Sequence, residues 1–408
     1  MRIGFDAKRI VRNGTGLGAY GRTLLNDLNR LVADGLTIDT DRRPSAVSDG
    51  LELLLYAPDS GLDVLRRQML TGPSMRFVYP GGHPSALGKA WWRSHAIVGD
   101  LRRDGVQLFH GLSGELPLGL RRSGIVGVVT IHDLIFMRHP EYYHRVDAWI
   151  YRQKFRATCR EATRIIAISE RTRQDIMELG GVPSERIDLV YQSCNPRYSQ
   201  PLGREVVSAV ASRLALPRRY VLSVGSVERR KNVMLALKAM ALLPDDLHLV
   251  VAGRHTPYAD ELTAWAAKHG LLGRLHLLHS ISGLDLQALY QQADVFVYPS
   301  RYEGFGIPVI EAVFSRLPVV ACTGSCLEEA GGPYNIYVDP DDVEAMAEAI
   351  KRLLPGSEDR EGRIGRSLHY VERFRGTDVA RQVADVYRRA LRPSCLEDRP
   401  RASTAMSM

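Results

Sequence analysis

The stretch from residue 294 to residue 326 limits the fold more than any other part of this 408-residue chain. An apolar strand at 295–298 leads into a turn at Pro299 and Ser300, a glycine-containing loop, an apolar helix and a second apolar strand at 319–321. Two strands joined through a helix form a parallel strand-helix-strand unit. The chain therefore predicts an α/β protein with parallel sheets.

The loop inside this unit combines glycines with two acidic residues. Gly304 and Gly306 have no Cβ, so the backbone N–H groups around them can approach an oxygen-rich ligand, and Pro308 marks the first helical position. A helix N-terminus favours anions. Glu303 lies before this helix and Glu311 about one turn inside it, so the two carboxylates can address different parts of one ligand. We expect a phosphate-bearing ligand with hydroxyl groups here.

A group of cations follows another predicted strand, at 221–224. This strand ends at Gly225 and Ser226, and the helix after Asn232 is preceded by Arg229, Arg230 and Lys231. Cations at the carboxyl end of a strand and the start of a helix are typical of a diphosphate clamp. The alternative is a set of solvated surface charges.

A glycine pattern follows the first predicted strand, at 2–7. Gly16, Gly18 and Gly21 have the spacing of a dinucleotide-binding fingerprint, and a helix is expected from about residue 20 to residue 33. The next strand, at 51–56, does not end in the acidic residue that a dinucleotide site needs. A loop against another ligand and a tight turn without any ligand both remain open.

Histidines end two further apolar strands of the N-terminal half. One strand ends at His110, and the other ends at His132 and Asp133. Open α/β sheets hold ligands at the carboxyl ends of their strands, so these side chains are candidates for a site. Hydrogen-bonded structural histidines are the alternative.

Composition narrows the class of protein. The chain is 45% hydrophobic, which suits two globular domains, and it contains no apolar run of ~18 residues. Five scattered cysteines form no zinc pattern and are typical of a reducing cytosol. The net charge is +8, and residues 1–200 carry 28 Lys and Arg against 21 Asp and Glu. Solvated helix faces, an anionic membrane surface and an anionic acceptor each account for this excess; nucleic acid is not expected.

The sequence from Glu303 to Glu311, with its Gly-Phe-Gly loop, resembles the signature of retaining GT-B glycosyltransferases of family 4. The segments at 129–134 and 165–176 are also similar to strands and a strand-to-helix step of that family. The resemblance covers nearly the whole chain and is most specific from 220 to 330. It departs from the family in one place, because Ser226 stands where an arginine is usual, and we assign the missing charge to Arg230.

The resemblance implies two Rossmann-like domains that face a cleft. Residues 1–198 would bind the acceptor and residues 199–375 the nucleotide sugar, while a helix at 376–392 would cross back to the first domain. Residues 393–408 are expected to be disordered.

The resemblance also implies roles for individual residues. Glu303 and His132 would orient the donor sugar, and Arg230 and Lys231 would stabilise the leaving phosphate. Residues at 110 and 133 (His110, Asp133) would lie on the acceptor side. The donor would further contact Gly16, Gly18, Ser226, Gly253, Arg254, Gly304, Phe305, Gly306, Ile307 and Glu311.

The implied activity is retaining, metal-independent transfer of a hexose. The first expectation is mannose from GDP-mannose, passed to a saccharide or lipid-linked saccharide during cell-surface polysaccharide synthesis. No metal ion or cofactor is expected, since the nucleotide sugar is a substrate. The protein would be cytoplasmic, and its basic N-terminal half could contact the inner face of the membrane. A nucleotide-sugar epimerase of similar fold and a dinucleotide-dependent oxidoreductase are the alternatives.

Overall fold

A computed structural model describes residues 1–38, 50–82 and 85–392. The chain forms two compact units, one of residues 1–193 with the chain from Gly376 onward, the other of residues 194–375. The first unit ends at Ser193, five residues before the domain boundary at 198 that the sequence predicts. The tail predicted to be disordered, 393–408, lies outside the described residues.

The first unit is built on a parallel sheet of seven strands, in the order β3-β2-β1-β4-β5-β6-β7. The strand order reverses direction between β1 and β4, which makes this the switch point of the sheet. Phe5 pairs with His110 across these two strands. The strands are β1 (Arg2–Asp6), β2 (Glu52–Tyr56), β3 (Met75–Val78), β4 (Leu108–Gly111), β5 (Val126–Ile131), β6 (Arg164–Ala167) and β7 (Ile187–Leu189).

Helices connect these strands and pack against the sheet. They are α1 (Lys8–Arg12), α2 (Gly16–Ala33), α3 (Asp63–Arg66), α4 (Ala86–Trp91), α5 (Ile97–Arg103), α6 (Ile135–Arg138), α7 (Arg145–Glu161) and α8 (Glu170–Gly180). A π-helical turn, Trp92–Ala96, joins α4 to α5. Ser169 caps α8 by accepting the N–H of Thr172, as its position before the helix predicts.

Helix α2 begins at Gly16, four residues before the predicted start. The glycines were expected in a loop, but Gly16 and Gly18 lie in the first turn of the helix and Gly21 lies in the second. A Cβ at Gly18 would lie 1.8 Å from the carbonyl oxygen of Asn13, so α2 can pack onto the end of α1 only if residue 18 is glycine. Local packing therefore accounts for one glycine of the dinucleotide-like pattern.

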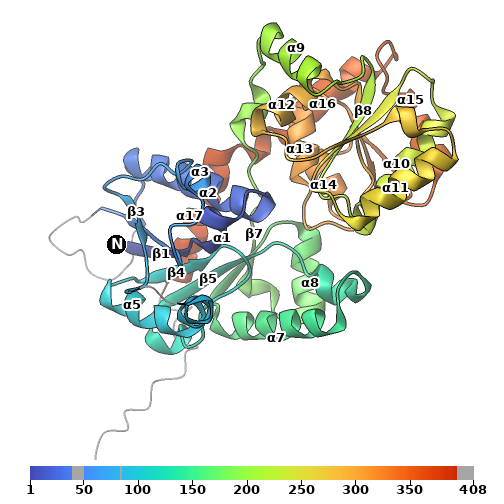
Figure 1. Ribbon diagram of the computed structural model, residues 1–408. Helices are drawn as coiled ribbons and strands as arrows, with labels where there is room; N and C mark the ends of the chain where they lie inside the picture. Colours follow the sequence, from blue (N-terminus) through green and yellow to red (C-terminus); the bar gives the residue numbers. More distant parts are fainter. Residues whose placement is uncertain (39–49, 83–84, 393–408) are drawn as a thin grey trace, which may run out of the picture. The chain divides into compact units, whose positions relative to one another are not determined.

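The last described helix, α17 (Gly376–Ala390), belongs to the first unit and lies beside α2 (Figure 1). Val383 and Tyr387 are completely buried in the core that α17 shares with α2 and β1. The hydroxyl of Tyr387 lies 2.7 Å from Nδ1 of His110, whose Nε2 lies 2.9 Å from the hydroxyl of Thr130. A buried polar network thus fixes α17 to the carboxyl end of β4.

The second unit repeats the same topology with six parallel strands, in the order β10-β9-β8-β11-β12-β13. Its switch point lies between β8 and β11. The strands are β8 (Tyr220–Val224), β9 (His248–Ala252), β10 (Leu275–Leu278), β11 (Val295–Tyr298), β12 (Val319–Cys322) and β13 (Ile336–Val338). The helices are α9 (Arg204–Arg213), α10 (Val233–Ala239), α11 (Pro257–Lys268), α12 (Gly283–Gln292), α13 (Ile307–Phe314), α14 (Leu327–Gly331), α15 (Val343–Lys351) and α16 (Arg360–Val371).

The predicted strand-helix-strand unit at 294–326 is confirmed as β11, α13 and β12. Helix α13 begins at Ile307, so Pro308 occupies its second position rather than its first. The predicted α/β class, with two parallel-sheet Rossmann-like domains, is confirmed as well. Within the described ranges, we find no helix that has both the length and the apolar character needed to cross a membrane.

The network around His110 predicts a measurable contribution to stability. Tyr387→Phe keeps the packing of the ring but leaves a buried nitrogen of His110 without its partner, which we expect to lower the free energy of unfolding by about 1–3 kcal/mol. Urea unfolding followed by tryptophan fluorescence measures the change, because the buried Trp92 lies in the same unit. Tyr151→Phe, at a residue that is 43% exposed on α7, is the matched control and should have no effect. Equal midpoints for the two variants would contradict the anchoring role of Tyr387.

Candidate active site

The predicted cations and the predicted loop acid meet in the second unit. Lys231 and Arg230 lie on a 3-10 turn after β8, and Glu303 lies in the loop after β11, so both segments follow the two strands of the switch point. Oε1 of Glu303 is 2.7 Å from Nζ of Lys231 and 2.9 Å from Nη1 of Arg230. The three side chains are only 10–16% exposed. We call them the Glu303 cluster.

The backbone holds the cations in place. Asn232, directly after Lys231, adopts the left-handed conformation with φ of 54°, and its side-chain amide donates to the carbonyl oxygen of Pro340 at 2.8 Å. The guanidinium of Arg230 also donates to the carbonyl oxygen of Tyr302. Asn232 fixes the end of the turn, and the contact with Tyr302 ties Arg230 to the loop that carries Glu303. The two cations therefore converge on one point.

Aromatic and thiol groups complete the surroundings of the cluster. The ammonium group of Lys231 bonds to the hydroxyl of Tyr298 and lies 4.7 Å from the centre of that ring, which adds a cation–π interaction. The thiol of Cys326 donates to the carbonyl oxygens of Glu303 and Phe305 at 3.1 and 3.0 Å. These contacts fix the loop that carries Glu303.

The charges of the cluster control one another. Burial raises the pKa of Glu303, but the charges of Lys231 and Arg230 outweigh this effect and hold the pKa below its usual value. Burial lowers the pKa of Lys231, and the carboxylate of Glu303 more than reverses the shift. All three groups are therefore charged near neutral pH. Glu228 also lies 3.9 Å from Nη2 of Arg230, but it is shared with Arg254, so three cations facing two carboxylates leave a surplus positive charge.

A narrow crevice lies beside this surplus charge. Its walls include Ser223, Gly225, Ser226, Lys231, Tyr298 and Ser300. Thus Ser226, which replaces the usual arginine, lies at the same crevice as the predicted phosphate-binding lysine. Gly253 lies behind it, where a Cβ would lie 1.7 Å from the carbonyl oxygen of Gly225. Arg254 is an exposed neighbour, and its Nη2 is 3.4 Å from Oε1 of Glu228.

The glycine loop runs from the cluster into α13. Gly306 precedes the helix with φ of 117°, and a Cβ there would lie 2.8 Å from Cδ2 of Leu327. Glycine is therefore required for backbone conformation and for packing. Phe305 is buried against Phe374, with the ring centres 5.3 Å apart. Gly304 and Ile307 stay partly exposed on either side.

Glu311 lies in the second turn of α13, apart from the cation pair. The residue is partly exposed, and Oε2 of its carboxyl group accepts a hydrogen bond from the hydroxyl of the buried Tyr290 at 2.9 Å. Burial raises the pKa of this carboxyl to about 7, although hydrogen bonds from Tyr290 and Tyr198 act in the opposite direction. Glu303 is thus held ionised, whereas Glu311 titrates near neutral pH.

The first unit contains the remaining predicted residues. His132 is half-buried between Gln192, whose amide is 2.7 Å from Nδ1, and the carbonyl oxygen of Leu112, which is 2.8 Å from Nε2. Burial lowers the pKa of His132 to about 4, so the ring is neutral at pH 7. The neighbouring Asp133 accepts the N–H of Ile135 at 3.1 Å.

Of two other residues predicted for the site, His110 is buried and Gly16 is exposed. His110 has no exposed surface, and both of its nitrogens bond to protein groups, so the structure gives it the structural, hydrogen-bonded role that was the alternative and not the expected role on the acceptor side. By contrast, Gly16 is exposed at the start of α2, with no atom within 4 Å of an added Cβ.

Sequence reasoning missed a charged group at the switch point of the first sheet. Asp6 ends β1 and is buried, and its Oδ2 lies 2.8 Å from Nη2 of Arg93. The other terminal nitrogen of Arg93 lies 2.7 Å from Oε2 of Glu115, which follows β4. An acidic residue at the end of the first strand was the available signal, but its partner is 87 residues away in the sequence.

The described part of the chain contains no group of three or more His, Cys, Asp or Glu side chains placed to hold a metal ion. The site consists instead of fixed cations, a carboxylate and a glycine loop at the switch point of the second of two parallel sheets. Fold and site together define the class of GT-B glycosyltransferases.

Comparisons with known proteins agree with this class. The profile of the family described as "Glycosyl transferases group 1" matches residues 208–366, and that of "Glycosyltransferase Family 4" matches residues 45–197. This chain belongs to the group 1 glycosyltransferases.

Two relatives match along nearly their whole length. O-antigen chain mannosyltransferase B of Escherichia coli is 28% identical, with 95% of this chain and 100% of the relative covered. O-antigen chain mannosyltransferase RfbU of Salmonella typhimurium is also 28% identical, with coverage of 90% and 94%.

Solved structures show the same fold at low sequence identity. A glycosyltransferase from Rickettsia africae has a TM-score of 0.73 at 14% identity, with 96% of this chain and 99% of that chain covered. HepE of Anabaena, solved with UDP and glucose, has a TM-score of 0.71 at 16% identity, with coverage of 95% and 99%.

The charge balance of the Glu303 cluster predicts an effect on stability. Glu303→Gln leaves two enclosed cations facing each other, and we expect it to lower the free energy of unfolding by about 2 kcal/mol or more. Chemical denaturation without ligand measures the change. Glu261→Gln is the matched control, because Glu261 pairs with Arg229 at an exposed position and should contribute less than about 1 kcal/mol. Equal losses for both variants would show that burial adds nothing to the Glu303 pairs.

Proposed function

We propose that this protein is a retaining mannosyltransferase that transfers mannose from GDP-mannose to a saccharide or lipid-linked saccharide during polysaccharide synthesis. The Glu303 cluster at the switch point carries the proposal, because it is a fixed positive site beside a glycine loop. The names of the O-antigen relatives support mannose and a polysaccharide product. We place the reaction on the cytoplasmic side of the membrane, with the basic N-terminal half as the surface that would contact it.

The chemistry follows from how charge changes during transfer. As the bond between the sugar and the phosphate breaks, negative charge develops on the departing phosphate, and Arg230 and Lys231 are fixed where they can stabilise it. In the structure, the carboxylate of Glu303 pairs with both of these cations. We propose that bound donor diphosphate takes over part of this pairing, so that Glu303 can face the sugar ring as it gains positive charge.

Two further residues would position the donor. The carboxylate of Glu311 can accept hydrogen bonds from both ribose hydroxyls, which binds the nucleotide equally in ground and transition states. His132 is neutral and both of its ring nitrogens bond to protein groups, so it would orient the sugar by contact with the fixed ring rather than by proton transfer. We assign no protein base, since the leaving phosphate can itself take the proton of the acceptor.

The proposal is tested by binding and then by transfer. Thermal shifts with GDP, UDP and ADP identify the nucleotide, because a ligand at 100 times its Kd stabilises by about 2.7 kcal/mol. Transfer from GDP-mannose is then measured, with NMR of the anomeric carbon to read retention. Lys231→Ala should weaken nucleoside diphosphate binding by about 1.5–3 kcal/mol, whereas Lys238→Ala, at an exposed lysine of α10, should not. A stronger shift with UDP or ADP than with GDP would contradict the proposed donor.

Substitutions of Glu303 and Glu311 should change different kinetic constants. Glu303→Gln should mainly lower kcat, because its carboxylate acts on the sugar in the transition state. Bare GDP should bind this variant at least as tightly as it binds the parent, since both cations are then available. Calorimetry with GDP followed by transfer kinetics decides between the roles. Loss of GDP binding in Glu303→Gln would reverse the assignment.

The raised pKa of Glu311 predicts a pH dependence of donor binding. Its carboxyl becomes protonated as pH falls through about 7, and the protonated form, in which one oxygen carries the proton, accepts more weakly from the two ribose hydroxyls. The donor KM should therefore rise below this pH in the parent. Glu311→Gln should have a higher KM that no longer changes with pH there. Glu344→Gln, at an exposed residue of α15, should keep the profile of the parent.

The two cations also predict that transfer needs no divalent metal. Activity should persist in EDTA after dialysis, because Arg230 and Lys231 supply the positive charge at the phosphate. A loss of transfer in EDTA that Mg²⁺ or Mn²⁺ restores would refute this part of the proposal.

A further inference from the structure

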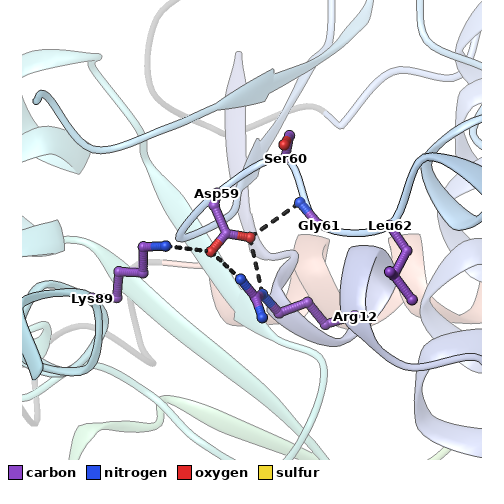
Figure 2. Close-up of a pocket in the computed structure, with 6 residues that line it drawn as sticks. All are labelled: Arg12, Asp59, Ser60, Gly61, Leu62 and Lys89. Atoms are coloured by element: carbon purple, nitrogen blue, oxygen red, sulfur yellow. Dashed lines mark hydrogen bonds and ion pairs between the residues drawn. The ribbon is translucent and has the colours of Figure 1, made fainter. Parts of the chain in front are cut away.

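An open pocket of about 480 Å³ lies in the first unit, and none of the residues that line it is one that the sequence singled out. It is lined by the last residue of α1, by the loop after β2 and by α4, through Arg12, Asp59, Ser60, Gly61, Leu62 and Lys89 (Figure 2). The loop that begins at Asp59 follows the carboxyl end of β2, the end at which open α/β sheets hold their ligands. The volume suits a small ligand or one group of a larger one.

The pocket is organised around the carboxylate of Asp59. Nε of Arg12 lies 2.9 Å from Oδ1, Nη2 of Arg12 bonds to Oδ2, and Nζ of Lys89 lies 2.8 Å from Oδ2. The N–H of Gly61 donates to Oδ1 at 3.1 Å. Figure 2 shows both cations reaching the same carboxylate from different sides. These partners are 47 and 30 residues from Asp59 in the sequence, so only the tertiary structure brings them together.

The backbone makes this arrangement rigid. The N–H of Leu62 donates to the carbonyl oxygen of Val11 at 2.8 Å, which ties the loop to α1. Gly61 has φ of 63°, and a Cβ there would lie 2.3 Å from the same carbonyl oxygen. Only glycine allows this approach, and the approach sets Asp59 beside Arg12.

The pocket retains unused donor capacity. Side-chain exposures are 50% for Arg12, 33% for Lys89 and 20% for Asp59, so the two cations are more accessible than the carboxylate. Within the described residues, Nη1 of Arg12 has no protein partner, and Lys89 has N–H groups beyond the one that bonds to Asp59. Two cations and one carboxylate leave a net positive charge in a concave surface.

We propose that this pocket binds an oxyanion, a phosphate or a carboxylate, carried by the acceptor. The guanidinium of Arg12 and the ammonium of Lys89 already converge on one oxyanion, the carboxylate of Asp59. An oxyanion of a ligand would bind the same two groups in the same way. The claim that the acceptor carries this oxyanion rests on the proposed glycosyl transfer. The claim that the pocket binds an oxyanion does not rest on it.

A nearby group of three charged residues has the exposure and local spacing of an ordinary surface ion-pair cluster. Asp63 also contacts two arginines, Arg66 and Arg67, but these lie one turn away on the same helix. All three side chains are 39–81% exposed, and none of the three lines the pocket. Asp63 and its arginines therefore supply a matched control.

The test measures binding of pyrophosphate by calorimetry. All variants carry Lys231→Ala, which weakens anion binding at the cation pair of the second unit and so reduces its share of the measured binding. Arg12→Ala and Lys89→Ala should each weaken pyrophosphate binding about tenfold or more, and Arg67→Ala should leave it unchanged. Equal affinity in the Arg12, Lys89 and Arg67 variants would overturn the proposal.

Asp59→Asn gives the test a result that a purely structural role would not produce. Removing the internal carboxylate leaves both cations without their anion, so pyrophosphate should bind several-fold more tightly and with a steeper salt dependence. Circular dichroism checks that the variant is folded. Unchanged or weaker binding by folded Asp59→Asn would overturn the proposal.

A second probe identifies the source of the oxyanion. Tighter binding of pyrophosphate than of glucuronate indicates a phosphate-linked acceptor, and the reverse order indicates an acidic saccharide. Arg12→Ala should leave GDP binding by the otherwise unaltered chain at its normal affinity. If the pyrophosphate results hold but no transfer from GDP-mannose is found, the proposed function fails while the oxyanion site stands. If transfer occurs but the pocket variants bind pyrophosphate normally, only the site fails.

Discussion

The candidate active site depends on one electrostatic constraint, the shared pairing of Glu303 with Lys231 and Arg230. Enclosed charges are unfavourable unless partners surround them, so the cations can be kept away from water only because the loop acid lies between them. The same pairing leaves a surplus positive charge beside the crevice. A site of this kind keeps its charges paired and leaves positive charge for the diphosphate that we propose it binds.

The parallel-sheet topology explains why the pairing forms. Lys231 and Glu303 are separated by 72 residues but follow β8 and β11, which are neighbours at the point where the strand order reverses. Loops on either side of such a point diverge and leave room for a ligand. The first unit repeats the principle with Asp6, Arg93 and Glu115, and the Asp59 pocket lies at the end of the next strand of the same sheet.

The glycines show that one residue type can serve two purposes. Gly306 and Gly61 both have positive φ, and both permit a backbone approach that a Cβ would prevent. At Gly61 the approach also places Asp59 next to its cations, whereas Gly306 lies in the same loop as Glu303. Gly18 differs, because its contact with Asn13 explains it by packing alone. A glycine pattern therefore indicates close approach, and the neighbouring atoms decide whether a ligand is involved.

The sequence by itself determined the α/β class, the strand-helix-strand unit and the residues of the Glu303 cluster, because apolar periodicity and short loop motifs are local properties. It placed the starts of α2 and α13 late, since helix ends depend on packing partners such as Asn13. Only the tertiary structure decided that His110 anchors α17, that Asp6 joins Arg93, and that Arg12 and Lys89 share Asp59. These contacts join residues that are 30 to 277 positions apart in the sequence. No local pattern shows which distant residue will pair with a given polar or charged side chain.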